Sequence, residues 1–255
     1  MTVEPEQASL EDWYDARYAE GGFGYDGRAA DWTAWVREHY LDEFDIRPGD
    51  RILDVGCGDG FWTAIFAGLG LRAAGVDLSS VGIEQARRRD PRLELAVADA
   101  GGDLPFEEAS FDVVFSRAIS HLSQQDLLTD ANRRLIANLV RYVRPGGLLL
   151  ISFYTKRDGG GTPVHAWHRA SDLVRLLEES ADPCHLDLVG NYLQIGAQRR
   201  DAPRRGRLRP AAGSSSASPT SSASPTLSPA ARAMRRLRRS IGARVRRLIG
   251  RARRS

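Results

Sequence analysis

Hydrophobic and polar residues after position 45 follow two alternating patterns. Short, continuous runs of apolar residues predict strands that are buried on both faces, as in a parallel sheet. The strands expected on this basis span 51–55, 73–77, 93–98, 111–116 and 148–153. Apolar residues spaced three or four positions apart predict amphipathic helices between the strands. These helices are expected over 60–68, 80–89, 127–143 and 173–180, with another over 31–44 before the first strand.

Two short apolar segments near residue 190 form a different pattern. Residues 186–189 and 192–197 predict strands, and Gly190-Asn191 between them is typical of a tight antiparallel hairpin. Strands that alternate with helices and end in one hairpin predict an α/β fold. We therefore expect a doubly wound, seven-stranded, mostly parallel sheet with a C-terminal antiparallel hairpin.

The composition changes after residue 198. Residues 202–230 are dominated by Pro, Ser, Ala and Thr and lack the apolar residues of a packed core, which predicts a disordered linker over 199–230. In residues 231–255, apolar residues recur every three or four positions among eleven arginines. This pattern predicts a basic amphipathic helix or a disordered tail. The folded domain is expected to span 1–198, with 1–45 as an N-terminal cap.

Charge divides between the same two parts of the chain. Residues 1–198 contain 32 acidic and 19 basic side chains, whereas residues 199–255 contain one acidic residue and 17 arginines. A concentrated basic segment favours anionic partners. Three such partners stay open for residues 231–255: an anionic membrane surface, nucleic acid, or acidic protein. A tail with no specific partner is the fourth alternative.

Neither export nor membrane insertion is expected from the sequence. Residues 1–12 are acidic and lack the apolar stretch of a signal peptide. Without a run of about eighteen apolar residues, no transmembrane segment is expected. The two cysteines, Cys57 and Cys184, give no disulfide framework. We therefore expect a cytoplasmic protein that is at most peripheral to a membrane.

A glycine loop follows the first predicted strand. The sequence Asp54-x-Gly56-x-Gly58-x-Gly60 lies between a strand and a helix, where doubly wound sheets bind ligands. Glycines let the backbone turn sharply and let a ligand approach it closely. In dinucleotide-binding proteins the third glycine follows one residue later, and the carboxylate of Asp54 suits a cationic ligand better than a pyrophosphate. The ammonium and sulfonium groups of S-adenosylmethionine meet this requirement.

Five segments, in order along the chain, resemble one protein family. The glycine loop 53–60 comes first, and the other four lie at or near the later predicted strands. These four are Gly75-Val76-Asp77-Leu78-Ser79, Ala98-Asp99-Ala100 with Leu104-Pro105-Phe106, Phe111-Asp112-Val113-Val114 and Arg144-Pro145-Gly146-Gly147. Residues 45–198 therefore resemble the class I, Rossmann-like S-adenosylmethionine-dependent methyltransferases, and most of all their small-molecule branch.

The resemblance implies how the cofactor is bound. Asp77 would accept hydrogen bonds from both ribose hydroxyls, with a helix N-cap as the alternative role. Asp99 would accept from the adenine amino group, with a solvated turn residue as the alternative, and Leu78 and Ala100 would lie on either face of the adenine. Cys57 is expected to be a small spacer and not a nucleophile. The expected cofactor-binding residues are Asp54, Gly56, Cys57, Gly58, Gly60, Asp77, Leu78, Asp99, Ala100 and Ser116.

Methyl transfer needs a positioned nucleophile, and it needs a general base only when the acceptor loses a proton. His121, which follows the fourth strand, is the candidate catalytic base, and a structural role is its alternative. Residues 154–169 follow the fifth strand and are expected to line the acceptor pocket. Within them, His165 and His168 have the spacing of a metal pair, but no third ligand is near, so no metal is expected.

Aromatic residues are concentrated in residues 11–45. They are expected to cap the cofactor, with Tyr14, Tyr18 or Trp32 facing the sulfonium by cation–π attraction. Packing of these rings against the sheet is the alternative.

The function that the sequence predicts is transfer of a methyl group from S-adenosylmethionine to an O, N or C atom of a small-molecule acceptor. Two alternatives stay open. One is a protein or nucleic-acid methyltransferase that is recruited through the arginine-rich tail. The other is a module that binds S-adenosylmethionine without catalysis.

Overall fold

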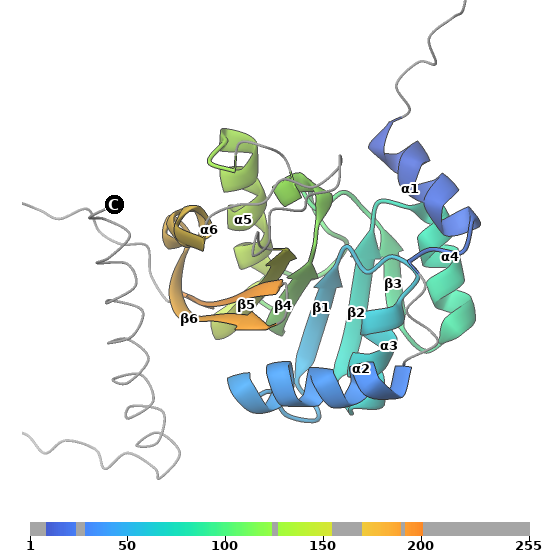
Figure 1. Cartoon of the computed structure of the whole chain (residues 1–255), viewed down its shortest axis with the longest axis horizontal. Coiled ribbons are helices and arrows are strands. Elements are labelled where there is room, and N and C mark those ends of the chain that lie inside the picture. Colours follow the sequence, from blue (N-terminus) through green and yellow to red (C-terminus); the bar gives the residue numbers. More distant parts are fainter. Residues whose placement is uncertain (1–8, 24–28, 124–126, 155–169, 190–191, 201–255) are drawn as a thin grey trace, which may run out of the picture. The chain divides into compact units, whose positions relative to one another are not determined.

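A seven-stranded sheet forms the centre of the fold and carries helices on both faces. The computed structural model describes residues 9–23, 29–123, 127–154, 170–189 and 192–200, which belong to one compact unit (Figure 1). The strand order is β3-β2-β1-β4-β5-β7-β6. Strand β7 pairs antiparallel with β5 and β6, and the other neighbouring strands pair in parallel. The predicted doubly wound sheet with its C-terminal hairpin is confirmed.

Every strand and helix predicted within residues 31–198 is present, and these elements follow one another as the alternating pattern predicts. The strands are β1 (Arg51–Val55), β2 (Arg72–Asp77), β3 (Glu94–Val97), β4 (Phe111–Arg117), β5 (Val143–Tyr154), β6 (Ala181–Val189) and β7 (Tyr192–Arg199). The helices are α1 (Leu10–Ala19), α2 (Ala29–Val36), α3 (Phe61–Gly68), α4 (Ser80–Arg89), α5 (Asp130–Tyr142) and α6 (Ala170–Glu178), with a π-helical turn η2 (Arg37–Asp42) and a 3-10 turn η3 (Ser120–Ser123).

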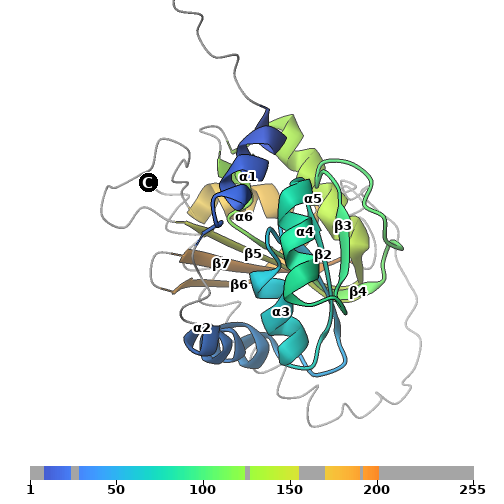
Figure 2. The ribbon, with the colours of Figure 1, turned by 90° about the vertical axis from the view of Figure 1, so that its right-hand side faces the viewer.

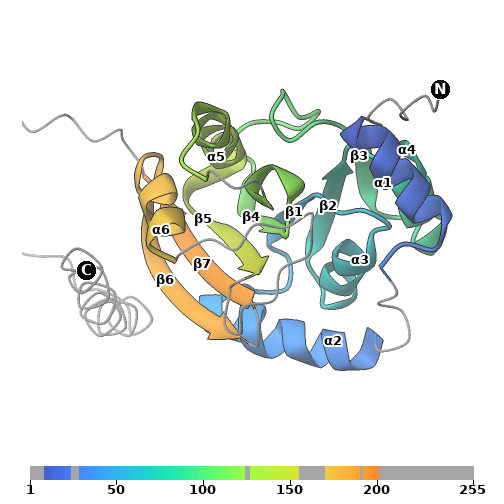
Figure 3. The ribbon, with the colours of Figure 1, turned by 45° about the horizontal axis from the view of Figure 1, so that its top comes forward.

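The helices form two layers. Helices α5 and α6 lie on one side of the sheet, and α2 and α3 lie on the other (Figure 3). Helix α4 lies in the same layer as α3, against β2 and β3 (Figure 2). The chain order reverses at β1, because β2 lies on one side of it and β4 on the other. Ligands bind beyond the carboxyl ends of the strands at such a reversal.

Helix α5 begins later than the hydrophobic pattern predicts. The expected helix spans 127–143, whereas the observed helix starts at Asp130. The hydroxyl of Thr129 accepts a hydrogen bond from the backbone N–H of Asn132 at 3.2 Å and caps the helix. The apolar residues before this cap belong to the preceding loop.

Two strands near the C-terminus are longer than predicted. Strand β5 begins at Val143 and includes Pro145-Gly146-Gly147, which was expected to be a turn. Strand β6 begins at Ala181, five residues before the expected start. Its register against β7 shifts between Pro183 and His185. A sheet tolerates proline at such an irregularity, because the missing N–H is not needed there.

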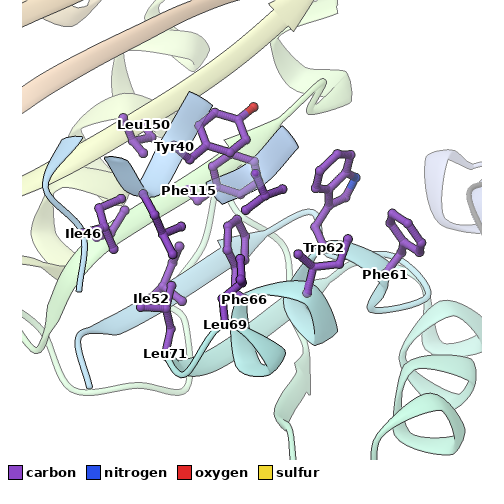
Figure 4. Packing of buried hydrophobic residues seen from close by; sticks show 14 residues of the cluster. Tyr40, Ile46, Ile52, Phe61, Trp62, Phe66, Leu69, Leu71, Phe115 and Leu150 are labelled. Carbon is purple, nitrogen blue, oxygen red and sulfur yellow. The ribbon is translucent and has the colours of Figure 1, made fainter. Parts of the chain in front are cut away.

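One part of the core lies between the sheet and helices α2 and α3. The rings of Phe66 and Tyr40 both meet the ring of Phe115 edge to face, each with centroids 5.1 Å apart (Figure 4). All three side chains are almost completely buried, and aromatic pairs favour this arrangement. The N-terminal segment therefore packs against the sheet through η2.

Helix α1 is attached to α4 by polar contacts. The carboxylate of Asp15 accepts hydrogen bonds from the hydroxyl of Ser79 and from the backbone N–H of Val81. At the other end of α1, the amide of Gln85 donates to the backbone oxygen of Tyr18 at 2.7 Å. Anionic side chains are favoured at a helix N-terminus, so Asp15 holds α1 beside the carboxyl ends of β1 and β2.

Residues 201–255 lie outside the described residues, so the predicted linker and basic helix stay predictions. Strand β7 continues to Arg199, one residue past the expected end of the domain. The guanidinium of Arg200 then donates hydrogen bonds to backbone oxygens of Glu178 and Ala181. In the part of the chain that the structure describes, no helix is long and apolar enough to span a bilayer.

Candidate active site

A pocket of about 140 Å³ opens where β1, β2 and β4 end. Its floor is formed by strand ends and the loops that follow them, and its other walls come from α1 and the start of α3. The lining residues are Trp13, Tyr14, Tyr18, Phe23, Val55, Gly56, Cys57, Asp59, Phe61, Trp62, Val76, Asp77, Leu78, Ala98, Ala100, Arg117, Ala118, Ile119, Ser120 and His121.

The glycine loop lies on the floor of the pocket. Gly56 and Gly58 have φ angles of 81° and 54°, which residues with a side chain rarely adopt. A Cβ atom at Gly58 would lie 2.1 Å from the hydroxyl of Tyr18. The loop is therefore closely covered by α1, and no side chain larger than hydrogen fits at Gly58.

Asp77, at the end of β2, fixes the shape of this loop. One carboxylate oxygen accepts a hydrogen bond from the backbone N–H of Gly58 at 2.8 Å, and the other accepts from Ser79 at 2.9 Å. Ser79 itself caps α4, because its hydroxyl accepts from Gly82 N. Asp77 therefore does not act as the N-cap. Burial raises the pKa of the Asp77 carboxyl, and these backbone hydrogen bonds oppose the rise.

Two residues of the predicted cofactor set lie behind the loop. Asp54 is 2% exposed and accepts a hydrogen bond from the hydroxyl of Thr63 at 2.7 Å. Burial raises the pKa of Asp54 to about 7. Gly60 precedes α3 with a φ of 74°, and a Cβ atom there would lie 2.7 Å from the Cβ of Ala86 on α4. Gly60 thus allows α3 and α4 to pack closely.

Cys57 lines the pocket and also fills space beneath it. A Cβ atom at Gly75 would lie 2.8 Å from the sulfur of Cys57, so the thiol packs directly on β2. Burial raises the pKa of the thiol well above its usual value, and the neighbouring carboxylates of Asp54 and Asp77 add to this effect. A thiol in this state stays protonated, which supports the expected role of a spacer.

The segment after β3 forms another wall. Leu78 and Ala100 both line the pocket. The side-chain amide of Asn138, on α5, donates hydrogen bonds to the backbone oxygens of Ala100 and Gly102 at 2.8 and 2.6 Å. Asp99 is exposed and accepts from the backbone N–H of Gly101 at 2.9 Å. Helix α5 therefore fixes the wall that Leu78 faces.

His121 lies beside Asp99 at the mouth of the pocket. Its Nε2 atom is 3.3 Å from a carboxylate oxygen of Asp99. Its Nδ1 atom is shielded from water and has no hydrogen-bond partner among the described residues. Ser116, the other predicted residue near this point, is completely buried, and its hydroxyl donates to the backbone oxygen of Val55 at 2.9 Å. Ser116 thus joins β4 to β1.

Helix α1 covers the pocket with aromatic side chains. The rings of Tyr14 and Tyr18 lie nearly parallel, with centroids 6.2 Å apart. Burial raises the pKa of both phenols, and a hydrogen bond with Ser120 partly offsets the rise at Tyr14. Tyr14 and Tyr18 line the pocket, as does Trp13. Trp32 instead meets Trp62 edge to face, and its ring lies against the guanidinium of Arg117.

Sequence analysis missed three polar or aromatic residues of the pocket wall. Asp59 was passed over as a loop position, and its carboxylate pairs with Arg89 at 2.8 Å. Trp62 lies in the helix predicted over 60–68 and was given no role. Arg117 was read as part of the segment that contains His121 and received no role. An arginine at the end of a buried strand is the signal that could have identified it, because a charge is costly there.

No group of three or more metal-ligating side chains comes together in the described part of the chain. His165 and His168 lie outside the described residues, as does most of the loop 154–169. The predictions for that loop therefore stay predictions.

Comparisons with known proteins agree on one family. Residues 52–147 match the family described as "Methyltransferase domain". A probable S-adenosylmethionine-dependent methyltransferase of Mycolicibacterium smegmatis is 29% identical over 179 residues, which are 66% of this chain and 66% of that protein. Residues 52–147 therefore form a methyltransferase domain, and the chain is similar to the class I S-adenosylmethionine-dependent methyltransferases.

Two further relatives show how widely this methyltransferase fold is used. The 2-methyl-6-phytyl-1,4-hydroquinone methyltransferase of Synechocystis is 30% identical over 150 residues, 57% of this chain and 44% of that protein. The crystal structure of the [4+2]-cyclase SpnF superposes with a TM-score of 0.58 at 19% identity, covering 78% of this chain and 98% of that one. The chain thus spans about half to two thirds of the curated relatives it matches.

The pocket of this methyltransferase domain fits S-adenosylmethionine, which is the cofactor of the family. Gly56 presents bare backbone to the pocket, and Asp77, which accepts from the backbone N–H of Gly58, adds a carboxylate to the pocket lining. Leu78 and Ala100 supply apolar surface for a flat ring system. When bound, the cofactor supplies an activated methyl group and its own leaving group.

Proposed function

We propose that the chain transfers a methyl group from S-adenosylmethionine to an O, N or C atom of a small-molecule acceptor. The observation that carries the proposal is the aromatic cover that α1 places over the pocket. Helix α1 covers the strand ends with Trp13, Tyr14 and Tyr18, and the pocket volume is about 140 Å³. A small molecule fits beneath such a cover, whereas a folded protein or a duplex nucleic acid needs an open face.

In this proposal different groups of the predicted residues contact different parts of the cofactor. Asp77 accepts from the ribose hydroxyls with lone pairs that Gly58 and Ser79 do not use. Leu78 and Ala100 hold the adenine, and Asp99 accepts from its amino group. The remaining predicted residues shape the floor beneath the methionine part of the cofactor: Asp54, Gly56, Cys57, Gly58, Gly60 and Ser116.

The protein's part in the reaction is to align the acceptor with the methyl group and to exclude water. Tyr14 and Tyr18 exclude water from above, and their ring faces suit a sulfonium. His121 accepts a proton where the acceptor must lose one. Its Nε2–H would donate to Asp99, which leaves the Nδ1 lone pair free to take the proton. The cofactor, when bound, would supply the methyl group and its own leaving group, and these residues would hold the acceptor in line with that group.

A macromolecular acceptor is favoured by one observation only, the 17 arginines in residues 199–255. All of these arginines except Arg199 and Arg200 lie outside the described part of the chain. A chain truncated after residue 200 separates the two readings, because the small-molecule proposal predicts unchanged methyl transfer. Loss of transfer together with loss of binding to nucleic acid or acidic protein would favour the alternative. Binding of the full chain, but not of the truncated one, to anionic vesicles would assign the tail to a membrane surface.

The direct test is a screen with cofactor that carries an isotopic label in the methyl group. The purified chain is incubated with pools of small metabolites, with total protein and with nucleic acid. The proposal predicts label in a small-molecule pool. Label confined to protein or nucleic acid would support the macromolecular alternative, and cofactor binding without label in any pool would support a non-catalytic module.

A further inference from the structure

Arg117, the last residue of β4, has its side chain enclosed by indole rings. Its guanidinium carbon lies 4.4 Å from the ring centroid of Trp62, and 5.6 and 5.8 Å from those of Trp32 and Trp35. The residue is 9% exposed and lines the pocket. Removing a cation from water is costly, and the faces of the three rings offset part of this cost. The tryptophans thus hold a positive charge at a fixed place in the pocket wall.

A row of buried polar side chains extends from Arg117 across the sheet. Arg117 is paired in register with Ser152 of β5, and Ser152 is paired with Gln194 of β7. Register partners present their side chains on the same face, with neighbouring strands about 4.8 Å apart. Tyr40 reaches this row from η2. Burial raises the pKa of its phenol, and the charge of Arg117 and the nearby hydroxyl of Ser152 oppose the rise. In Figure 4 the hydroxyl of Tyr40 points away from the aliphatic side chains of the core cluster.

Three polar atoms beside Arg117 are buried hydrogen-bond donors: the hydroxyls of Tyr40 and Ser152 and the amide nitrogen of Gln194. The Ser152 hydroxyl lies near the Tyr40 phenol, but none of the three atoms makes a hydrogen bond of ordinary geometry with a described residue. The three residues are at most 2% exposed. Buried donors without a partner are rare, and each one calls for an explanation. Three of them beside a fixed cation form an arrangement that suits an anion.

The position of the row separates it from the expected cofactor site. Ala100 follows β3, Asp77 ends β2 and the glycine loop follows β1, so the adenine, the ribose and the methionine part would extend from β3 towards β1. Arg117, Ser152 and Gln194 continue in the same direction over β4, β5 and β7. They therefore lie beyond the end of the cofactor that carries the methyl group, where the acceptor belongs.

We propose that Arg117, with Tyr40, Ser152 and Gln194, binds an anionic group of the acceptor, either a carboxylate or a phosphate. The inference rests on the proposed function, because the acceptor would enter the same pocket. A guanidinium binds both groups through paired N–H donors, and the neighbouring hydroxyl and amide groups would donate to the remaining oxygens. The substrate class is then an acid, and a neutral analogue would lose the charge-assisted hydrogen bonds to Arg117.

The test uses three ring compounds of similar size: benzoate, phenyl phosphate and the neutral benzamide. Each is titrated by calorimetry into the full chain saturated with S-adenosylhomocysteine. We expect at least one of the two anions to bind at least tenfold more tightly than benzamide, and the tighter anion identifies the group. We expect Arg117→Gln to weaken that binding at least tenfold. Equal affinity for benzamide and both anions, or no saturable binding of either anion, would overturn the proposal.

Arg51→Gln is the matched control. Arg51 also lies over an aromatic ring, 4.6 Å from the centroid of Phe111, but at the opposite end of the strands. This variant should bind the anion as the wild type does. Ser152→Ala is a second, milder probe for the case in which Arg117→Gln does not fold. It should weaken anion binding severalfold, and an unchanged affinity would contradict the proposal.

Affinity for S-adenosylhomocysteine distinguishes the remaining outcomes. If the wild type does not bind it, the proposed function itself fails. If the wild type binds it but does not prefer an anion, only this inference fails. If folded Arg117→Gln protein loses affinity for S-adenosylhomocysteine, Arg117 serves the carboxylate of the cofactor, and the assignment to the acceptor is wrong.

Discussion

The carboxylate of Asp77 accepts a hydrogen bond from the backbone N–H of Gly58 at 2.8 Å. This contact joins the end of β2 to the glycine loop after β1, across 19 residues of sequence. The same carboxylate is 8% exposed and lines the pocket. One side chain therefore sets the shape of the loop, and in the proposed function the same side chain accepts from the ribose of the cofactor.

Replacing Asp77 by Asn should weaken binding of S-adenosylhomocysteine by roughly tenfold to a hundredfold. A hydrogen bond to a charged group contributes about 1.5–3 kcal/mol, and about 1.4 kcal/mol corresponds to a factor of ten. Calorimetry measures the change. Asp112→Asn is the control, because Asp112 also accepts from a backbone N–H, that of Arg51 at 2.8 Å, at the other end of the sheet. Equal affinities of the two variants would refute the ribose assignment.

Asp54 makes the stability of the domain depend on pH. Its pKa of about 7 in the folded chain lies above the ordinary value of 3.8. The folded state therefore binds more protons than the unfolded state between about pH 4 and pH 7, and the free energy of unfolding falls as the pH rises through this range. Each unit of pKa corresponds to about 1.4 kcal/mol, so the contribution of Asp54 is at most about 4 kcal/mol.

Asp54→Asn tests this dependence. Asn can still accept from the hydroxyl of Thr63 but carries no charge at any pH. Relative to the wild type, the variant should gain stability as the pH rises from 5 to 8. Urea unfolding of both proteins at the two pH values measures the difference. A difference that is the same at pH 5 and pH 8 would show that Asp54 is ionised in the folded chain throughout.

Gly58 and Tyr18 should show a strong coupling in stability. Gly58→Ala introduces a methyl group 2.1 Å from the hydroxyl of Tyr18, at a φ of 54°. The backbone strain costs about 1–3 kcal/mol, and displacement of Tyr18 adds to it. Tyr18→Ala removes the clash, so the double variant should be less destabilised than the sum of the single variants by about 0.5–3 kcal/mol. Additive effects in urea unfolding would mean that α1 does not pack on the loop.

His121→Gln should lower the rate of methyl transfer by roughly a hundredfold to ten-thousandfold once an acceptor that loses a proton is known. Affinity for S-adenosylhomocysteine should stay unchanged, because His121 would act on the acceptor. His185→Gln is the control, since His185 lies on β6 and pairs with Glu43 instead. Retention of the full rate in His121→Gln would leave His121 with a structural role beside Asp99.

The bounds of a strand or helix could be predicted from the sequence where a single local pattern determines them. The apolar run at 51–55 gave the bounds of β1, and the spacing of apolar residues over 80–89 gave the bounds of α4. In each case the buried positions determine where the element begins and ends. The start of α5 depended on a competing signal, the Thr129 cap. The extension of β6 through Pro183 depended on pairing with β7, a contact that no local pattern contains.

Part of the candidate site could likewise be predicted from the sequence, and part could not. Motifs identified Asp77 and the glycines, because their chemistry lies in the residues themselves. They did not separate residues that face the pocket, such as Gly56, from residues that support it, such as Gly60. The environment of Arg117 was beyond local reasoning, since Trp32 and Trp62 reach it from separate helices.

Binding of S-adenosylmethionine and S-adenosylhomocysteine to the full chain is the measurement that tests the account most directly. Calorimetry on the purified protein should show saturable binding of both at one site per chain. Asp77→Asn should weaken both, and Asp112→Asn should weaken neither. Failure of both compounds to bind the wild-type chain would contradict the central claim.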